Sequence, residues 1–311
     1  MSRARARRAA LSLGAVLAVA AAFAGAPVVR AVETGRAECK SLTSKILGQA
    51  VPYCVLLPPG YDADATRRYP ILYYLHGLGD NEQMFVHSGG FNIVEDLWEA
   101  GKIGRFLIVT PAAGASFYIN SFDGRRRYED FFLKEFMPAI ERRYRAKSAR
   151  ASRAIAGISM GGYGAFHLAF RHPDLFCAAS AHSAALIEKL PAVDGIGAGA
   201  LGRMRVLGNV FGSPPDRAFW DRNSPLVMTR TTNLAGLKIY FDCGDRDDYG
   251  FNTGAAELDR ILTSRHIAHE FHLYAGGHDW PYFVEHLPAT LEFSSHALAA
   301  EGKASPAATA K

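Results

Sequence analysis

Short apolar runs alternate with amphipathic stretches along most of the chain. Most of the runs are too continuous for a sheet with one wet face, and they predict strands covered on both sides. The expected strands are Pro70–Leu75, Phe106–Thr110, Arg153–Ile158, Phe176–Ser180, Leu237–Asp242 and Glu270–Tyr274. The expected helices are Phe91–Ala100, Tyr128–Tyr144, Gly161–Arg171, Gly254–Arg265 and Pro281–Ala300. This alternation predicts one α/β domain over residues 32–300, with a mainly parallel central sheet and helices on both faces.

Three other segments depart from this rhythm. An antiparallel hairpin over about Glu38–Leu57 is expected before the first parallel strand. Leu186–Ala235 is rich in Gly and Pro and is longer than an ordinary connection, so we interpret it as an excursion over the carboxyl edge of the sheet. Residues 301–311 are small and polar, which predicts a disordered tail.

Residues 1–31 have the three-part pattern of a secretory signal peptide. Met1–Arg8 is rich in arginine, Ala9–Ala26 is an alanine-rich apolar run, and Val29-Arg30-Ala31 fits a cleavage site. A transmembrane anchor is the alternative, but the run is only weakly apolar, so we expect no stable membrane anchor. The pattern predicts a secreted or periplasmic protein, and it leaves the choice between Sec and twin-arginine export open.

The formal net charge of +5 comes from this leader. Residues 1–31 contain five arginines and no acid, so the remaining chain holds 30 basic and 30 acidic residues. Binding to the phosphate backbone of nucleic acid needs a basic face, which this balance does not support. The hydrophobic share of 49% and the charged share of 21% are ordinary for a globular protein and exclude a disordered body.

Four cysteines are too few for a small disulfide scaffold. Cys39 and Cys54 lie on the two expected hairpin strands, which Leu47-Gly48 joins, so a cross-strand disulfide is possible. Cys177 and Cys243 lie in apolar runs and are interpreted as small buried side chains. Four cysteines allow three pairings, and the spacing alone does not choose among them.

The segment Gly157-Ile158-Ser159-Met160-Gly161 stands directly between an expected strand and an expected helix. This is the context of a nucleophile elbow, in which a sharp turn raises the serine hydroxyl above the sheet. Small residues two before and two after the serine keep the strand and the helix from colliding. The pattern therefore predicts Ser159 as a nucleophile.

A serine nucleophile needs a base, and the base needs an acid that orients it. His278 follows the last expected strand in Gly276-Gly277-His278, and an acidic run follows the strand before it. The order serine, aspartate, histidine is the one expected for this kind of fold. The spacing leaves three candidates for the acid, which are Asp245, Asp247 and Asp248.

A Gly-rich segment, His76–Asn81, directly follows the expected strand Pro70–Leu75. Acyl transfer builds negative charge on a carbonyl oxygen, and fixed backbone N–H groups stabilise it by about 3 kcal/mol each. Glycines allow the backbone to approach a substrate closely. We assign the two oxyanion donors to the N–H groups of Leu78 and Met160, the residue after the nucleophile.

With these motifs in place, the chain resembles the esterase D group of α/β-hydrolases over about residues 40–295. That group contains feruloyl and acetylxylan esterases, S-formylglutathione hydrolases and mycolyltransferases. The resemblance rests on Tyr53–Tyr61 (YCVLLPPGY), His76–Glu82 (HGLGDNE), Gly157–Gly162 (GISMGG), Asp242–Asp247 (DCGDRD) and Gly276–Trp280 (GGHDW). It implies an α/β-hydrolase fold. It also implies Asp247 as the acid, beside Ser159, His278 and the donors Leu78 and Met160.

These patterns predict a secreted serine carboxylic-ester hydrolase that acts on acylated carbohydrate or aryl esters of the feruloyl or acetyl type. The alternatives are an acyltransferase with the same triad and a non-catalytic binding protein. Trp280, His182 and Tyr118 are the expected substrate contacts at the cleft. We expect neither a metal nor an organic cofactor, because the sequence has no H-E-x-x-H, P-loop or dinucleotide motif. The expected partner is a small-molecule or carbohydrate-linked ester, and the oligomeric state is not predicted.

Overall fold

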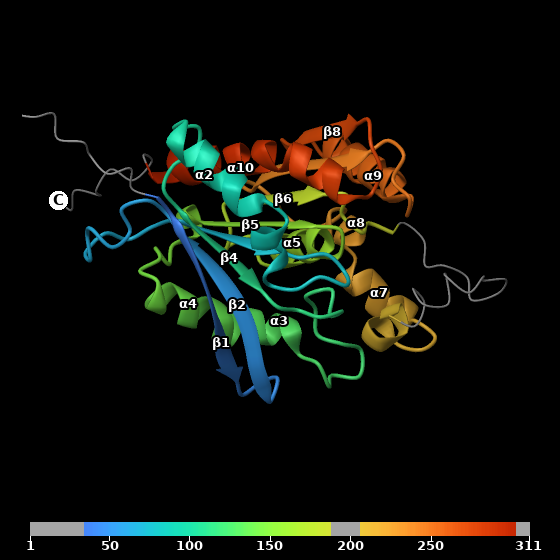
Figure 1. Ribbon diagram of the computed structural model, residues 1–311. Helices are drawn as coiled ribbons and strands as arrows, with labels where there is room; N and C mark the ends of the chain where they lie inside the picture. Colours follow the sequence, from blue (N-terminus) through green and yellow to red (C-terminus); the bar gives the residue numbers. More distant parts are fainter. Residues whose placement is uncertain (1–33, 188–205, 303–311) are drawn as a thin grey trace, which may run out of the picture. The chain divides into compact units, whose positions relative to one another are not determined.

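The computed structural model describes residues 34–187 and 206–302. The expected signal peptide lies outside these residues. Residues 188–205 of the expected excursion and all but the first two residues of the expected tail also lie outside them. The described chain contains one eight-stranded sheet with the order β1-β2-β4-β3-β5-β6-β7-β8 (Figure 1).

The sheet is antiparallel at one edge and parallel elsewhere. β1 (Arg36–Ser44) and β2 (Gln49–Leu57) form the expected hairpin, and β2 also pairs antiparallel with β4 (Leu107–Pro111). The other strands run parallel to their neighbours. They are β3 (Ile71–Leu75), β5 (Arg153–Ile158), β6 (Ala178–His182), β7 (Lys238–Gly244) and β8 (Glu270–Tyr274). The carboxyl ends of these five strands therefore meet at one edge of the sheet.

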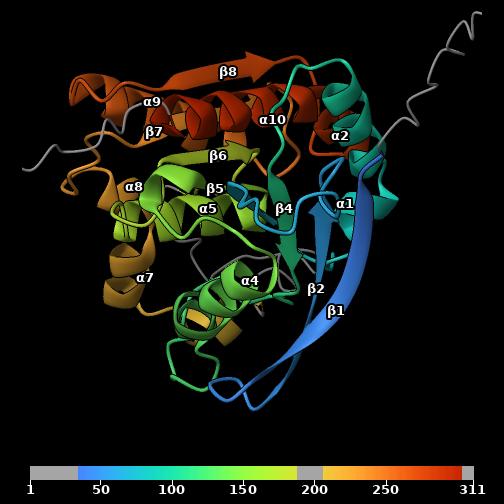
Figure 2. The same cartoon turned by 90° about the vertical axis from the view of Figure 1, so that its left-hand side faces the viewer.

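Helices cover both faces of the sheet, as the alternation predicts. One face packs on α1 (Met84–His87), α2 (Gly90–Glu99) and α10 (Trp280–Gly302). The other packs on α3 (Tyr128–Phe131), α4 (Met137–Arg143), α5 (Met160–Arg171), α7 (Arg217–Asn223), α8 (Pro225–Met228) and α9 (Phe251–Ser264). Alternate residues of β3 enter the two cores, with Tyr73 in one and Tyr74 in the other. In Figures 1 and 2, α2 and α10 lie together, away from α4.

The expected helix Tyr128–Tyr144 is interrupted. A π-helical turn, η1 (Phe132–Phe136), separates α3 from α4, and the N–H of Met137 donates to the carbonyl of Phe132. Pro138 explains the change, because proline lacks an N–H and its ring clashes with the carbonyl four residues earlier. The expected strand Phe176–Ser180 also begins two residues later, as β6. A short 3₁₀ turn, η2 (Arg150–Ser152), leads into β5.

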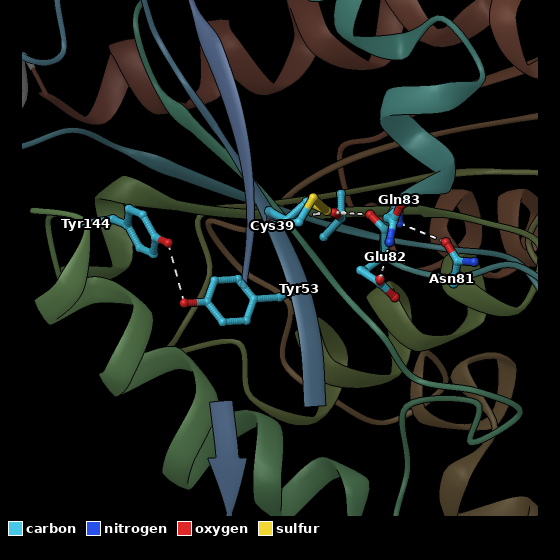
Figure 3. The surroundings of a disulfide bond; sticks show 8 residues. Cys39, Tyr53, Asn81, Glu82, Gln83 and Tyr144 are labelled. Carbon is cyan, nitrogen blue, oxygen red and sulfur yellow. Dashed lines mark hydrogen bonds between the residues drawn. A yellow bond between two sulfur atoms is a disulfide. The ribbon is translucent and has the colours of Figure 1, made fainter. Parts of the chain in front are cut away.

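Cys39 and Cys54 form a disulfide across the hairpin. They are direct partners in the register of β1 and β2, which brings their Cα atoms within 4.0 Å. Figure 3 shows the surroundings of the bond, with Tyr53 and Tyr144, whose hydroxyl oxygens lie 3.4 Å apart. Cys177, just before β6, and Cys243 on β7 are buried as expected.

Candidate active site

The side chains of Ser159, His278 and Asp247 meet at the carboxyl edge of the sheet. Ser159 follows β5, Asp247 follows β7 and His278 follows β8. Nε2 of His278 lies 3.0 Å from the hydroxyl oxygen of Ser159, and Nδ1 lies 2.7 Å from Oδ2 of Asp247. The three segments are far apart in the sequence, and the parallel order of the strands brings them together.

The turn at Ser159 depends on close backbone packing. Ser159 has φ 54°, a left-handed conformation that is costly for a residue with a side chain. A Cβ at Gly157 would lie 2.4 Å from the carbonyl of Gly161, and one at Gly161 would lie 2.0 Å from the carbonyl oxygen of Leu75. Both positions therefore require glycine. The N–H of Ser159 donates to the carbonyl of His182 on β6, which helps to hold the strained turn.

The hydrogen bonds of Asp247 fix the orientation of the His278 ring. An ionised carboxylate only accepts, so Nδ1 of His278 carries the proton and Nε2 can accept a proton from Ser159. The second carboxylate oxygen accepts the N–H groups of Tyr249 and Phe251. Burial alone would raise the pKa of Asp247. Three interactions outweigh burial and hold the pKa of Asp247 below its usual value. They are the hydrogen bond to His278, the electrostatic attraction between His278 and the carboxylate, and the hydrogen bonds from the two backbone N–H groups.

The other two aspartates of the acidic run support the loop that carries the histidine. A carboxylate oxygen of Asp245 accepts the N–H of Gly276 at 3.0 Å, and one of Asp248 accepts the N–H of His278 at 3.4 Å. Asp247 is therefore the only one of the three candidate acids that is hydrogen-bonded to the imidazole ring within the described part of the chain.

A cavity of about 610 Å³ opens above Ser159. Leu78 and Met160, the expected oxyanion donors, line it together with Ser159, His278 and Trp280. Met160 is the first residue of α5, where backbone N–H groups have no partner inside the helix. Most of the other wall residues are apolar or aromatic, and they are Phe117, Ile158, Ala185, Ile187, Val206, Leu207, Tyr249, Phe251 and Phe283. Three aspartates also line the cavity, which are Asp80, Asp248 and Asp279.

Two of the three expected substrate contacts do not line this cavity. Trp280 does, but Tyr118 and His182 are fully buried. The Tyr118 hydroxyl donates to the carbonyl of His76, and His182 turns toward Asp242 on β7. Phe117, the residue before Tyr118, faces the cavity instead. Both have positive φ values, 53° and 60°, and this sharp turn reverses the direction of the side chains.

Three aromatic side chains that pack against the ring of His278 were not identified by the sequence analysis. Tyr249 and Phe251 follow Asp247, and their rings contact the ring of His278 edge to face, with centroids 4.7 and 5.4 Å away. Phe283, on the first turn of α10, makes a similar contact at 5.2 Å. The proximity of Tyr249 and Phe251 to the acid in the sequence was the signal that could have identified them.

The described residues contain no group of three or more His, Cys, Asp or Glu side chains arranged to hold a metal ion. Within residues 34–187 and 206–302, no helix combines the length and the apolar character needed to cross a bilayer.

Comparisons with known proteins identify the family and the fold. Residues 44–293 match the family described as "Putative esterase". Esterase MT1326 of Mycobacterium tuberculosis (strain CDC 1551 / Oshkosh) is 33% identical over 253 residues, which cover 72% of this chain and 51% of that protein. The acetyl esterase of Caldicellulosiruptor saccharolyticus is 27% identical, with 72% of this chain and 82% of that protein covered.

A solved structure of a ferulic acid esterase has the same fold. It superposes with a TM-score of 0.73 at 28% identity, and the match covers 85% of this chain and 99% of that one. The chain spans about half the length of the first curated relatives it matches. It belongs to the "Putative esterase" family and has the α/β-hydrolase fold.

Proposed function

We propose that the protein is an exported serine carboxylic-ester hydrolase in which Ser159 is the nucleophile, His278 the base and Asp247 the orienting acid. One observation carries the proposal. The chain of contacts from Asp247 through His278 to Ser159, at 2.7 and 3.0 Å, ends at a hydroxyl group that lines a cavity large enough for a substrate.

The reaction begins when the hydroxyl oxygen of Ser159 attacks the ester carbonyl and Nε2 of His278 takes the proton. Asp247 stabilises the imidazolium that forms, and its lowered pKa keeps it ionised in this role. The N–H groups of Leu78 and Met160 stabilise the oxyanion of the tetrahedral intermediate. The C–O bond of the ester then breaks, and His278 returns the proton to the departing alcohol.

Water completes the second half of the reaction. A water molecule attacks the carbonyl carbon of the acyl-enzyme, and His278 takes a proton from that water. The second tetrahedral intermediate then collapses, releasing the acid, and Ser159 regains its proton. No step requires a metal ion or an organic cofactor.

The proposed substrates are neutral acylated carbohydrate or aryl esters of the feruloyl or acetyl type. Phe117, Tyr249 and Trp280 offer flat apolar surfaces to a ring. The charged residues of the described wall are all acidic, which disfavours an anionic substrate; they are Asp80, Asp248 and Asp279. The names of two relatives, an acetyl esterase and a ferulic acid esterase, agree with this substrate class.

Export is part of the proposal. The leader pattern of residues 1–31 predicts it. The disulfide between Cys39 and Cys54 supports it, because such bonds persist in oxidising compartments and are rare in the cytosol.

The test is hydrolysis of p-nitrophenyl acetate by the wild type, Ser159→Ala and the control Ser183→Ala. Ser183 is buried beside the site and does not line the cavity, so its variant should keep wild-type activity. Ser159→Ala should lose about 10⁴-fold or more in kcat. Serine-independent turnover would overturn the proposal.

A panel of acetyl, feruloyl and longer acyl esters, with and without an added acceptor alcohol, then tests the substrate class. Free acid should be the main product. Dominant transfer of the acyl group to the alcohol would instead identify an acyltransferase.

A further inference from the structure

His76 is a buried histidine beside the cavity that takes no part in the contacts from Asp247 to Ser159. It follows β3 directly and is 4% exposed. Both of its ring nitrogens have a backbone partner. The N–H of Ala113 donates to Nε2 at 2.9 Å, and Nδ1 lies 2.7 Å from the carbonyl oxygen of Gly77.

These partners determine the protonation state of the ring. Ala113 presents a donor, so Nε2 must carry a lone pair and cannot carry a proton. The carbonyl of Gly77 is an acceptor, so Nδ1 must carry the proton. The ring is therefore neutral, with its hydrogen on Nδ1. Burial lowers the pKa of His76 and favours the same neutral form.

The carbonyl that His76 holds belongs to the peptide group between Gly77 and Leu78. In a planar trans peptide the C=O and N–H bonds point in opposite directions. Fixing the carbonyl of Gly77 therefore fixes the direction of the Leu78 N–H. Gly77 and Leu78 both line the cavity with Ser159, and the Gly77 carbonyl also accepts the N–H of Asp80 at 3.3 Å.

We propose that His76 is a positioning residue for the oxyanion site: its Nδ1–H holds the Gly77 carbonyl and so aims the Leu78 N–H at the carbonyl oxygen of the ester. The inference rests on the proposed function, because it assumes that Leu78 donates to an oxyanion. It also assigns a role to Tyr118. The hydroxyl of Tyr118 donates to the backbone carbonyl of His76 at 3.0 Å, and its ring contacts the imidazole edge to face.

A matched pair of amide variants separates positioning from simple packing. The side-chain nitrogen of asparagine lies close to the place of Nδ1, so His76→Asn keeps a donor for Gly77 and loses the acceptor for Ala113. The amide group of glutamine lies close to the place of Nε2, so His76→Gln keeps the acceptor for Ala113 and loses the donor for Gly77. Both variants are neutral and polar.

The two variants should rank in opposite order in activity and in stability. His76→Asn leaves the buried N–H of Ala113 without a partner, so it should have the lower Tm. His76→Gln should have the lower kcat, by about 10- to 100-fold relative to His76→Asn, with KM little changed, since loss of one oxyanion donor lowers kcat by about 10²- to 10³-fold. Equal kcat values, or a kcat order that follows Tm, would overturn the inference.

Affinity for a transition-state analogue gives a second readout. The inhibition constant of a boronic acid, which forms a tetrahedral adduct with a serine, should rise in His76→Gln in proportion to the loss of kcat/KM. An unchanged inhibition constant would contradict a role in oxyanion binding. Ser159→Ala distinguishes a failure of the proposed function from a failure of the proposed role of His76. If it is inactive while the two His76 variants are alike, only the role of His76 fails.

The wild type tests the inference even if neither variant folds. Nitrogen NMR of the histidine rings should show His76 neutral, with its hydrogen on Nδ1. A hydrogen on Nε2, or a charged ring at neutral pH, would overturn the inference.

Discussion

Two histidine–aspartate pairs are built around β7, and they differ in what surrounds them. His182 and Asp242 are direct partners in the register of β6 and β7, and both side chains are 0% exposed. His278 and Asp247 lie beyond the ends of β8 and β7, and His278 lines the cavity above Ser159. The distance from Nδ1 to the carboxylate is 2.8 Å in the first pair and 2.7 Å in the second.

The second pair is aligned for proton transfer and the first is not. The contact of His182 with Asp242 lacks the alignment of a hydrogen bond, and the other carboxylate oxygen of Asp242 accepts the hydroxyl of Tyr282. His278 is hydrogen-bonded on both ring nitrogens, to the carboxylate of Asp247 on one side and the hydroxyl of Ser159 on the other. The same two residue types therefore form a fully buried pair on the strands and, just beyond the edge of the sheet, the pair that we propose to be reactive.

The largest expected difference between the two pairs is in kcat when each aspartate is replaced by asparagine. Asp247→Asn should lower kcat by about 10³- to 10⁴-fold, because the amide can hold His278 in the wrong tautomer. Asp242→Asn, measured per folded molecule, should stay within about tenfold of the wild type, because Asp242 contacts neither His278 nor Ser159. Steady-state kinetics on both variants checks the difference, and similar losses would show that the two pairs act as one unit.

Stability should reverse the order of the two sites. Asp242→Asn leaves His182 buried against a neutral amide and should lower the free energy of unfolding by about 3 kcal/mol. Denaturant unfolding measures this loss, and Asp247→Asn should lose less because the amide oxygen of asparagine can still accept the N–H groups of Tyr249 and Phe251. The buried pair would have no structural role if Asp242→Asn unfolded at the wild-type midpoint.

Replacing either of the other two aspartates of the acidic run should have a smaller effect on activity than replacing Asp247. Asp245→Asn and Asp248→Asn each weaken one hydrogen bond to the backbone of the histidine loop. An exposed hydrogen bond of this kind contributes about 1 kcal/mol, which corresponds to roughly a fivefold loss of kcat/KM at most. A loss as large as that of Asp247→Asn in either variant would show that the acid is wrongly assigned.

The smallest effect concerns pH. The pKa of Asp247 is lower in the folded protein than in the unfolded chain, so its ionised form contributes stability that is present above its ordinary pKa of 3.8. This contribution is lost as the pH falls through the folded value. The stability difference between wild type and Asp247→Asn should therefore shrink as urea unfolding is repeated from pH 7 down to pH 3. A difference that grew on acidification would contradict the direction of the shift.

Much of the site could be predicted from the sequence because it lies directly after strands. Ser159 and His278 each stand in a short loop at the end of an apolar run, and parallel strands bring such loops to one edge. The acid was harder to assign, because three aspartates lie within four residues. The backbone decides among them, since the N–H of Asp247 donates to the carbonyl of Gly244 and turns its side chain toward His278.

The errors have local backbone causes. Tyr118 is buried while its neighbour Phe117 lines the cavity, and the two successive residues have positive φ, which no apolar pattern predicts. His182 is expected at the cleft because it ends a strand, but its side chain lies on the face of the sheet covered by α10 and meets Asp242. The π-helical turn before Pro138 likewise depends on one proline within an otherwise regular helical pattern.

The most direct test of the central claim is covalent labelling with a fluorophosphonate, followed by intact mass measurement and peptide mapping. The wild type should gain one adduct, on Ser159. Asp247→Asn should label far more slowly, and Asp242→Asn should label within about tenfold of the wild-type rate. An adduct on a different residue, or equal slowing in the two aspartate variants, would contradict the assignment of His278 and Asp247 as the pair that activates Ser159.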